Sequence, residues 1–77
     1  MSIQVKLFGL LADVVGKSEI HFQNVNDTDS LKEKIISDFP DMKKHSFVMA
    51  VCKQIIKENY FLKSGDEVVL LPPFAGG

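Results

Sequence analysis

Lys63-Ser64-Gly65-Asp66-Glu67-Val68-Val69-Leu70-Leu71 is the stretch of this 77-residue chain that decides the fold. Its first four residues are of the kinds that form turns, and the run from Glu67 to Leu71 that follows is apolar on both faces. Strands of that kind lie inside a sheet, with a neighbouring strand on each side. We therefore expect residues 67–71 to form a central strand of a sheet.

The residues after this strand are Pro72-Pro73-Phe74-Ala75-Gly76-Gly77. Glycine has no Cβ, so a Gly-Gly ending fits a slot that is too narrow for side chains. The two prolines fix φ and resist helix, so we expect residues 72–77 to leave the domain as a flexible, extended tail of at most roughly 20 Å. Gly-Gly alone is weak evidence, since many chains end in small residues. Because the stiff Pro72-Pro73-Phe74 segment precedes Gly-Gly, the α-carboxylate of Gly77 becomes the candidate reactive group.

Two alternating segments near the start of the chain predict a hairpin. Ile3, Val5 and Leu7 alternate with polar residues, and so do Ile20 and Phe22 within residues 19–23. Period-two alternation indicates a strand with one buried face. Residues 9–15, between the two segments, are too apolar for a plain loop and suggest a helical turn.

Residues 28–39 predict an amphipathic helix. One stripe of this segment is apolar and the other face is charged, and Pro40 ends the pattern. Thr28 is the expected N-cap, although Ser30 with Glu33 offers a competing capping box. The apolar stripe consists of Leu31, Ile35, Ile36 and Phe39.

Two further apolar segments, 47–51 and 55–56, read as strands. The resulting order of two strands, one helix and three strands suits a mixed sheet of four or five strands over one helix, an α+β roll. No linker, repeat or low-complexity segment interrupts it. We therefore expect a single domain over residues 1–77.

Composition excludes several classes of function. The net charge is −1, arginine is absent and the lysines are scattered, so nucleic acid is an unexpected partner. One cysteine, Cys52, allows neither an internal disulfide nor a cysteine-based metal site, and we expect no metal. The chain has no membrane-spanning stretch and no signal peptide, so we expect a cytoplasmic protein without a membrane partner. We interpret His21 and His45 as surface residues.

Strand parity places apolar side chains on the open face of the sheet. If Leu7 faces the helix, Phe8 points the other way, and either Val68 and Leu70 or Val69 and Leu71 do the same. An apolar patch beside a tail would suit docking to a partner. The alternative is a bend after Leu7 that covers Phe8.

These residues resemble the MoaD/ThiS-type sulfur carriers of the β-grasp, ubiquitin-like fold, and most closely the small subunits of molybdopterin synthase. Three features carry the resemblance. They are the Gly65-Asp66-Glu67-Val68 turn, the ending Leu71-Pro72-Pro73-Phe74-Ala75-Gly76-Gly77, and Phe8 followed by the Val14-Val15-Gly16 loop. In length and element order, the resemblance covers the whole chain.

The resemblance implies a function for the tail. An adenylating partner similar to ubiquitin-activating enzymes would couple Gly77 to AMP by consuming ATP, and a sulfur donor protein would convert it to a C-terminal thiocarboxylate (1-thioglycine). The large molybdopterin synthase subunit, as part of a heterotetramer, would supply the catalytic side chains and receive sulfur for a pterin precursor. No cofactor would be bound permanently. Gly76 would fit the slot, and the partner-binding residues would be Phe8, Ile55, Leu71, Pro72, Pro73, Phe74 and Ala75.

Two alternatives stay open. One is a sulfur carrier for thiamine, cysteine or tRNA thiolation. The proline pair before Gly-Gly argues against a thiamine carrier. The other is a ubiquitin-like binding or conjugating module whose Gly77 ends in an isopeptide bond.

Cys52 stands where relatives often have asparagine. It could carry a persulfide, but we interpret it as a small inert residue at the end of a buried strand.

Overall fold

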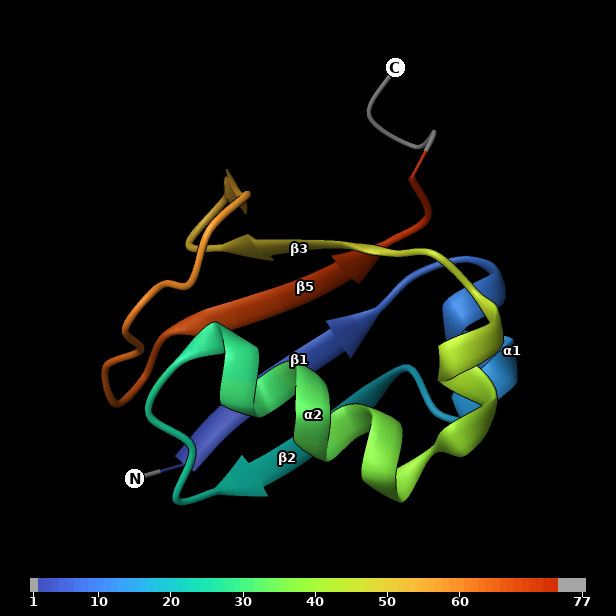
Figure 1. Cartoon of the computed structure of the whole chain (residues 1–77), viewed down its shortest axis with the longest axis horizontal. Helices are drawn as coiled ribbons and strands as arrows, with labels where there is room; N and C mark the ends of the chain where they lie inside the picture. Colours follow the sequence, from blue (N-terminus) through green and yellow to red (C-terminus); the bar gives the residue numbers. More distant parts are fainter. Residues whose placement is uncertain (1, 74–77) are drawn as a thin grey trace.

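A five-stranded mixed sheet with the strand order β2-β1-β5-β3-β4 forms the centre of the molecule (Figure 1). The structure is a computed structural model, and it describes residues 2–73. The strands are β1 (Ser2–Leu7), β2 (Glu19–Gln23), β3 (Val48–Val51), β4 (Gln54–Ile56) and β5 (Glu67–Leu71). The helices are α1 (Leu10–Val15), α2 (Thr28–Asp38) and the 3-10 helix η1 (Pro40–Lys44).

Strand β5 lies in the middle of the sheet, as its sequence predicts. It pairs in parallel with β1 and antiparallel with β3. The predicted hairpin of β1 and β2 and the predicted helical turn α1 are both present. A mixed sheet that curls around one helix is the β-grasp arrangement, so the predicted α+β roll is confirmed with five strands.

The core lies between the sheet and α2, which covers one face (Figure 1). The pairing register aligns Val5 with Val68 and Leu7 with Leu70, so the fully or nearly fully buried side chains of β1 and β5 form continuous rows. Leu31 and Ile35 of α2 close over these rows with no exposed surface. Alternation of apolar and polar residues along each strand is therefore what places the helix on this face.

Helix α2 begins at Thr28, and its N-cap is Asp27, so the prediction of Thr28 as the cap is wrong. The Asp27 carboxylate accepts hydrogen bonds from the Ser30 backbone N–H (3.3 Å) and the Ser30 hydroxyl (2.8 Å). These bonds, the hydroxyl bond foremost, lower the pKa of Asp27. At its other end the helix stops at Asp38, one residue earlier than predicted, because Phe39 precedes Pro40 and is held out of the helical region (φ −131°, ψ 78°).

The Thr28 side chain has a tertiary role instead of a capping role. It is buried, and its hydroxyl accepts a hydrogen bond from the Tyr60 N–H (2.9 Å) and donates one to Asn59 Oδ1 (3.3 Å). The Thr28 N–H donates to the Tyr60 carbonyl (2.9 Å). Thr28 therefore ties the segment between β4 and β5 to the start of α2.

A two-residue turn, Cys52-Lys53, joins β3 to β4 because Val51 pairs with Gln54. Both turn residues have positive φ, 49° and 70°, as in a type I′ turn. Cys52 is exposed, so the interpretation of Cys52 as a buried residue is wrong. Asparagine is favoured at this backbone conformation, which explains why it would suit the position better than cysteine.

We expect Thr28→Val to lower the free energy of unfolding by roughly 1–3 kcal/mol, because the Tyr60 N–H loses its acceptor. Thr28→Ser keeps the hydroxyl and is the matched control, which should retain the larger part of that energy. Urea unfolding followed by circular dichroism would measure both. Equal losses in the two variants would show that the hydroxyl contributes nothing.

We expect Cys52→Asn with Lys53→Gly to raise the free energy of unfolding by about 1 kcal/mol, since Asn-Gly is the preferred type I′ pair and a left-handed lysine is strained. Lys17→Gly is the control, because Lys17 does not have positive φ. Thermal melts would report the change. A double variant no more stable than the parent would contradict the assigned turn.

Candidate functional site

The face of the sheet opposite α2 is apolar over β5, β3 and β4. The register places Val69, Ala50 and Ile55 side by side across these three strands. Leu71 lies beside Val48 in the next row. The Phe8 N–H donates to the Leu70 carbonyl (3.2 Å), which continues the β1–β5 pairing past Leu7 and turns Phe8 to the same open face. The open-face patch, as we name it, consists of Phe8, Val48, Ala50, Ile55, Val69 and Leu71.

Phe8 and Ile55 are the most prominent members of the open-face patch, each 50% exposed. Leu71 is half-buried, as are Val48 and Val69. Three residues expected to bind a partner, Phe8, Ile55 and Leu71, thus lie on one face. Phe8 is not covered by a bend in β1. Val48 was not predicted to lie on this surface, although the parity of its strand relative to β5 carries the signal.

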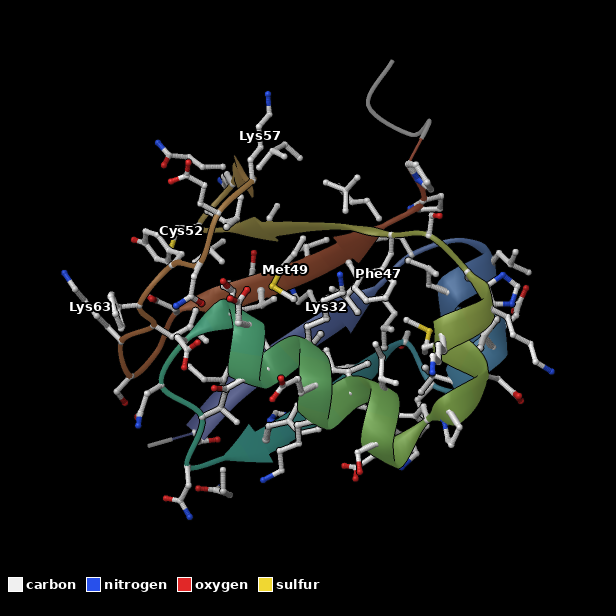
Figure 2. All side chains as sticks on the ribbon, viewed as in Figure 1. Lys32, Phe47, Met49, Cys52, Lys57 and Lys63 are labelled. Carbon is white, nitrogen blue, oxygen red and sulfur yellow. The ribbon has the colours of Figure 1, made fainter. Side chains whose placement is uncertain are left out.

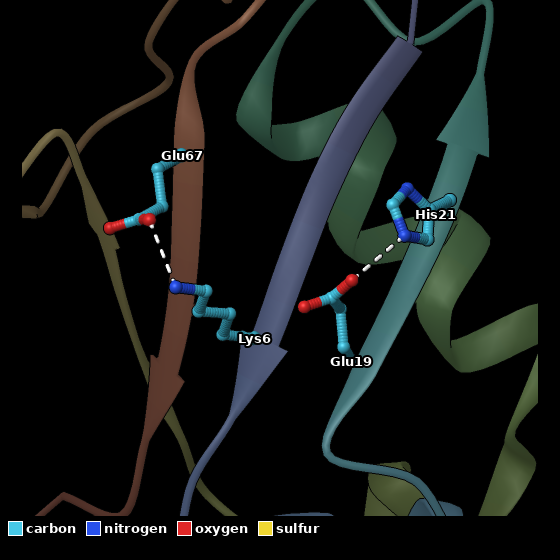
Figure 3. Close-up of polar contacts among 4 residues, drawn as sticks. All are labelled: Lys6, Glu19, His21 and Glu67. Atoms are coloured by element: carbon cyan, nitrogen blue, oxygen red, sulfur yellow. Dashed lines mark hydrogen bonds and ion pairs between the residues drawn. The ribbon is translucent and has the colours of Figure 1, made fainter.

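The part of the open face over β1, β2 and the start of β5 is charged (Figure 3). Lys6 Nζ lies 3.2 Å from Glu67 Oε2, and His21 Nε2 lies 3.0 Å from Glu19 Oε2. Hydrogen bonds from Gln4 and then His21 lower the pKa of the Glu19 carboxyl. These exposed polar groups border the open-face patch. The patch is therefore confined to the end of β5 and the strands beside it.

The strand that forms the middle of the open-face patch leads directly into the tail. Pro72 is half-buried and Pro73 is exposed. The other predicted tail residues, Phe74, Ala75, Gly76 and Gly77, lie outside the described residues. The structure therefore shows where the tail starts, directly after Leu71 at the end of β5.

A groove of about 340 Å³ adjoins the open-face patch between α2 and the β3–β4 hairpin, and Val48 and Ile55 of the patch line it. Phe47 and Met49 lie along it, with Lys32 Nζ 5.6 Å from the centre of the Phe47 ring (Figure 2). The rest of its lining consists of Thr28 and Asp29 of α2, Ile56 of β4, and Lys57 and Glu58, which follow β4. The groove holds no cysteine or histidine, and it faces α2 rather than the start of the tail.

Cys52, His21 and His45 do not belong to the open-face patch. Cys52 lies at the far end of β5 from the tail, because its N–H bonds to the Glu67 carbonyl (3.0 Å) at the start of that strand. Leu71 lies four residue positions along the strand from Glu67, roughly 13 Å away. His21 is exposed as expected, whereas His45 is half-buried. Residues 2–73 contain no group of three or more His, Cys, Asp or Glu side chains that could hold a metal ion.

Membrane insertion by a helix has no support in the part of the chain that the structure describes. None of its helices is long and apolar enough to span a bilayer. The longest, α2, has 11 residues.

Known structures share this fold over the whole domain. Small archaeal modifier protein 1 of Methanosarcina acetivorans superposes with a TM-score of 0.82 at 21% identity, covering 99% of this chain and 96% of that one. A putative molybdopterin converting factor subunit 1 from Pyrococcus furiosus gives 0.82 at 22% identity, with 95% and 98% covered. Both identities are low, so these likenesses establish the β-grasp fold alone.

A chain of the complex of subunits 1 and 2 of molybdopterin-converting factor from Helicobacter pylori is more similar in sequence. It is 28% identical, has a TM-score of 0.74, and each chain is covered completely. A comparison with curated proteins finds no match. The family model described as the ThiS family matches residues 5–77, which is nearly the whole chain. By fold, by length and by this match, the chain belongs to the ThiS family, one of the ubiquitin-like sulfur carriers.

Proposed function

We propose that this chain is the sulfur carrier of molybdopterin synthesis and that Gly77 carries the sulfur as a thiocarboxylate. The observation that supports this most is that β5, which carries Val69 and Leu71 of the exposed apolar patch, leads in the sequence through Pro72 and Pro73 to the Gly-Gly ending. The likeness to a chain of the Helicobacter pylori complex of molybdopterin-converting factor subunits supports the choice of pathway.

The open-face patch is the surface that would bind the large molybdopterin synthase subunit. Phe8 and Ile55 offer two large, half-exposed side chains. They lie on either side of Val69 and Leu71, which belong to β5. Side chains of this kind, surrounded by residues that exclude water, carry most of the energy of protein interfaces. The ion pair of Lys6 and Glu67 borders the patch and would form part of its polar rim. Two carriers on a dimeric large subunit would form the heterotetramer.

The chemistry of Gly77 begins with activation, because a carboxylate is a poor electrophile. In the adenylating partner, a Gly77 carboxylate oxygen attacks the α-phosphorus of ATP, and pyrophosphate leaves. A sulfur donor at the oxidation level of hydrosulfide then attacks the carbonyl carbon. The C–O bond to AMP breaks and AMP departs with the electron pair, which leaves the thiocarboxylate.

The tail with its thiocarboxylate would then enter the large subunit, where the sulfur would act as the nucleophile toward a pterin precursor. Water cleaves the remaining acyl–sulfur bond and returns Gly77 to the carboxylate. A dithiolene contains two sulfur atoms, so its synthesis needs two deliveries. Gly76 would pass through the slot that leads to the active site, since it has no Cβ. The acid and base groups of this step belong to the large subunit.

Carriers for thiamine, cysteine or tRNA thiolation share the same activation step, and so does a conjugating module. These functions differ in the nucleophile or acceptor that receives the Gly77 acyl group or its sulfur. The likenesses to small archaeal modifier proteins are 18–21% identical and concern the fold only, so they favour none of these functions. The acceptor is therefore what an experiment must identify.

We expect the intact mass of the protein to rise by about 16 Da after incubation with ATP, an adenylating enzyme and a sulfur source, with the change located at Gly77 by fragmentation. Locating the change matters because oxidation of methionine or Cys52 gives nearly the same shift. Deleting Gly77 should abolish the change and leave the melting temperature as in the parent. A deletion that unfolds the protein would contradict a tail that is independent of the core.

We expect Phe8→Glu to raise the Kd for the large molybdopterin synthase subunit at least tenfold, about 1.4 kcal/mol, because the charge would be buried in an apolar interface. Phe61→Glu is the matched control. Phe61 is 74% exposed and lies outside the open-face patch, so its replacement should leave the Kd unchanged. Titration calorimetry would measure both, alongside melting curves. Equal Kd values for the two variants would place the interface elsewhere.

A further inference from the structure

We propose that the outer edge of β4 binds an extended segment of a partner protein, with an acidic residue at each end of the paired stretch. This surface goes beyond the proposed function, because neither Gly77 nor sulfur takes part in it. Strand β4 (Gln54–Ile56) lies at one edge of the sheet and, within the described chain, pairs with β3 alone. Its other side is therefore open to a further strand.

The backbone of Ile55 points away from the sheet. The Cys52 N–H donates to the Glu67 carbonyl of β5 (3.0 Å). The Val51 carbonyl belongs to the same planar trans peptide group, so it points the opposite way, toward β4, where Val51 pairs with Gln54. Backbone groups of successive strand residues point to alternate sides. The N–H and C=O of Ile55 therefore both point outward, ready to exchange two hydrogen bonds with an added strand.

A groove beside this edge has room for side chains of the added strand. It is the groove of about 340 Å³ between α2 and the β3–β4 hairpin, within the roughly 300–1,000 Å³ of ligand pockets. The two residues next to the one that pairs with Ile55 would face α2, because side chains alternate between the faces of a sheet. There they would meet Phe47 and Ile56, both half-buried. The charged residues of the groove are two lysines and two acids, so uncharged, apolar side chains fit it best.

Exposed lysines stand at both ends of β4. Lys53 precedes the strand and Lys57 follows it. Of the ion pairs within residues 2–73, none includes either lysine. Lys57 points away from α2 (Figure 2). In a strand paired at Ile55, the residues two positions before and after the paired one lie opposite these lysines, and opposite charges across strands stabilise the pairing. The segment that fits therefore has an acid at both positions and apolar residues beside its centre.

A second copy of this chain fits the same edge poorly. Two β4 strands paired antiparallel at Ile55 would bring Lys53 of each copy opposite Lys57 of the other. Like charges directly opposite each other destabilise strand pairing. Lysine on an edge strand is a common means by which proteins avoid edge-to-edge association. The two lysines therefore disfavour self-association and favour an acidic partner.

The opposite edge of the sheet lacks this charge pattern. Its outer strand, β2, begins at Glu19, whose Oε2 lies 3.0 Å from His21 Nε2. At the other end of β2, the Gln23 carbonyl accepts a hydrogen bond from Lys34 Nζ (3.3 Å). An acidic strand added to β2 would meet a carboxylate at one end. The proposal therefore concerns the β4 edge alone.

The test uses the full chain and two synthetic peptides. The probe is acetyl-Gly-Glu-Val-Thr-Val-Glu-Gly-amide, and the control is acetyl-Gly-Lys-Val-Thr-Val-Lys-Gly-amide. Each sequence has the same pattern in both directions, so it serves parallel and antiparallel pairing alike. NMR titration of the amide shifts gives the Kd, and hydrogen exchange of the amides locates the contact.

We expect the acidic peptide to bind the parent roughly tenfold more tightly than the lysine peptide, because two cross-strand charge pairs change from repulsive to attractive. Exchange of the Ile55 N–H should slow on binding of the acidic peptide, since this group gains an acceptor. Exchange of the Gln54 N–H, which faces β3, should stay as in the free protein.

The double variant Lys53→Glu with Lys57→Glu should reverse the preference, so that the lysine peptide binds more tightly. Lys17→Glu with Lys43→Glu is the matched control. It makes the same change in net charge at two exposed residues outside β4 and its flanks, so it should keep the preference for the acidic peptide. Melting curves verify that both variants are folded.

Equal affinity of the parent for the two peptides would overturn the proposal. So would unchanged exchange of the Ile55 N–H at roughly 1 mM acidic peptide. Amide shifts confined to Val69 and Leu71 would overturn it by placing the peptide on the open face. A dimer in analytical ultracentrifugation that protects the Ile55 N–H without peptide would assign the edge to a second copy instead. Failure of the proposed function leaves each of these results unchanged, because none requires sulfur at Gly77.

Discussion

The hydrogen bonds that join β5 to β1 on one side and to β3 on the other hold the two halves of the chain in one sheet. Strands β1 and β2 form one hairpin and β3 and β4 form another, and only β5 connects them. Its register aligns the buried rows that α2 covers. The same register brings Ile55, Val69 and Leu71 to the opposite face. The core and the open-face patch thus depend on a single strand.

Periodicity in the sequence was sufficient for most of the fold. The hairpin of residues 3–7 and 19–23, the helix from Thr28 and the central strand at 67–71 follow from patterns within each segment, because strands and helices bury one face at their own period. The start of α2 was predicted less well. Thr28 is a good capping residue, but the segment at Tyr60 uses its hydroxyl, so Asp27 caps the helix.

Cys52 illustrates a second limit. It follows an apolar run, which suggests burial, yet the pairing of Val51 with Gln54 places it in a tight turn. The candidate site was likewise only partly predictable from the sequence. Parity and the family resemblance were enough to place Phe8, Ile55 and Leu71 on one surface, whereas the pairing of Val48 with Leu71 depends on the register between two separate strands. No pattern within a segment reports such a contact.

The parallel pairing of β1 and β5 has a mechanical consequence. A partner that draws the Gly-Gly ending into a narrow channel applies tension along β5, whose hydrogen bonds to both neighbours run across the direction of pull. Such bonds resist in shear and share the load, so they must break together rather than one at a time. The domain can therefore be held firmly by its ending while the strand that bears the load stays in the sheet.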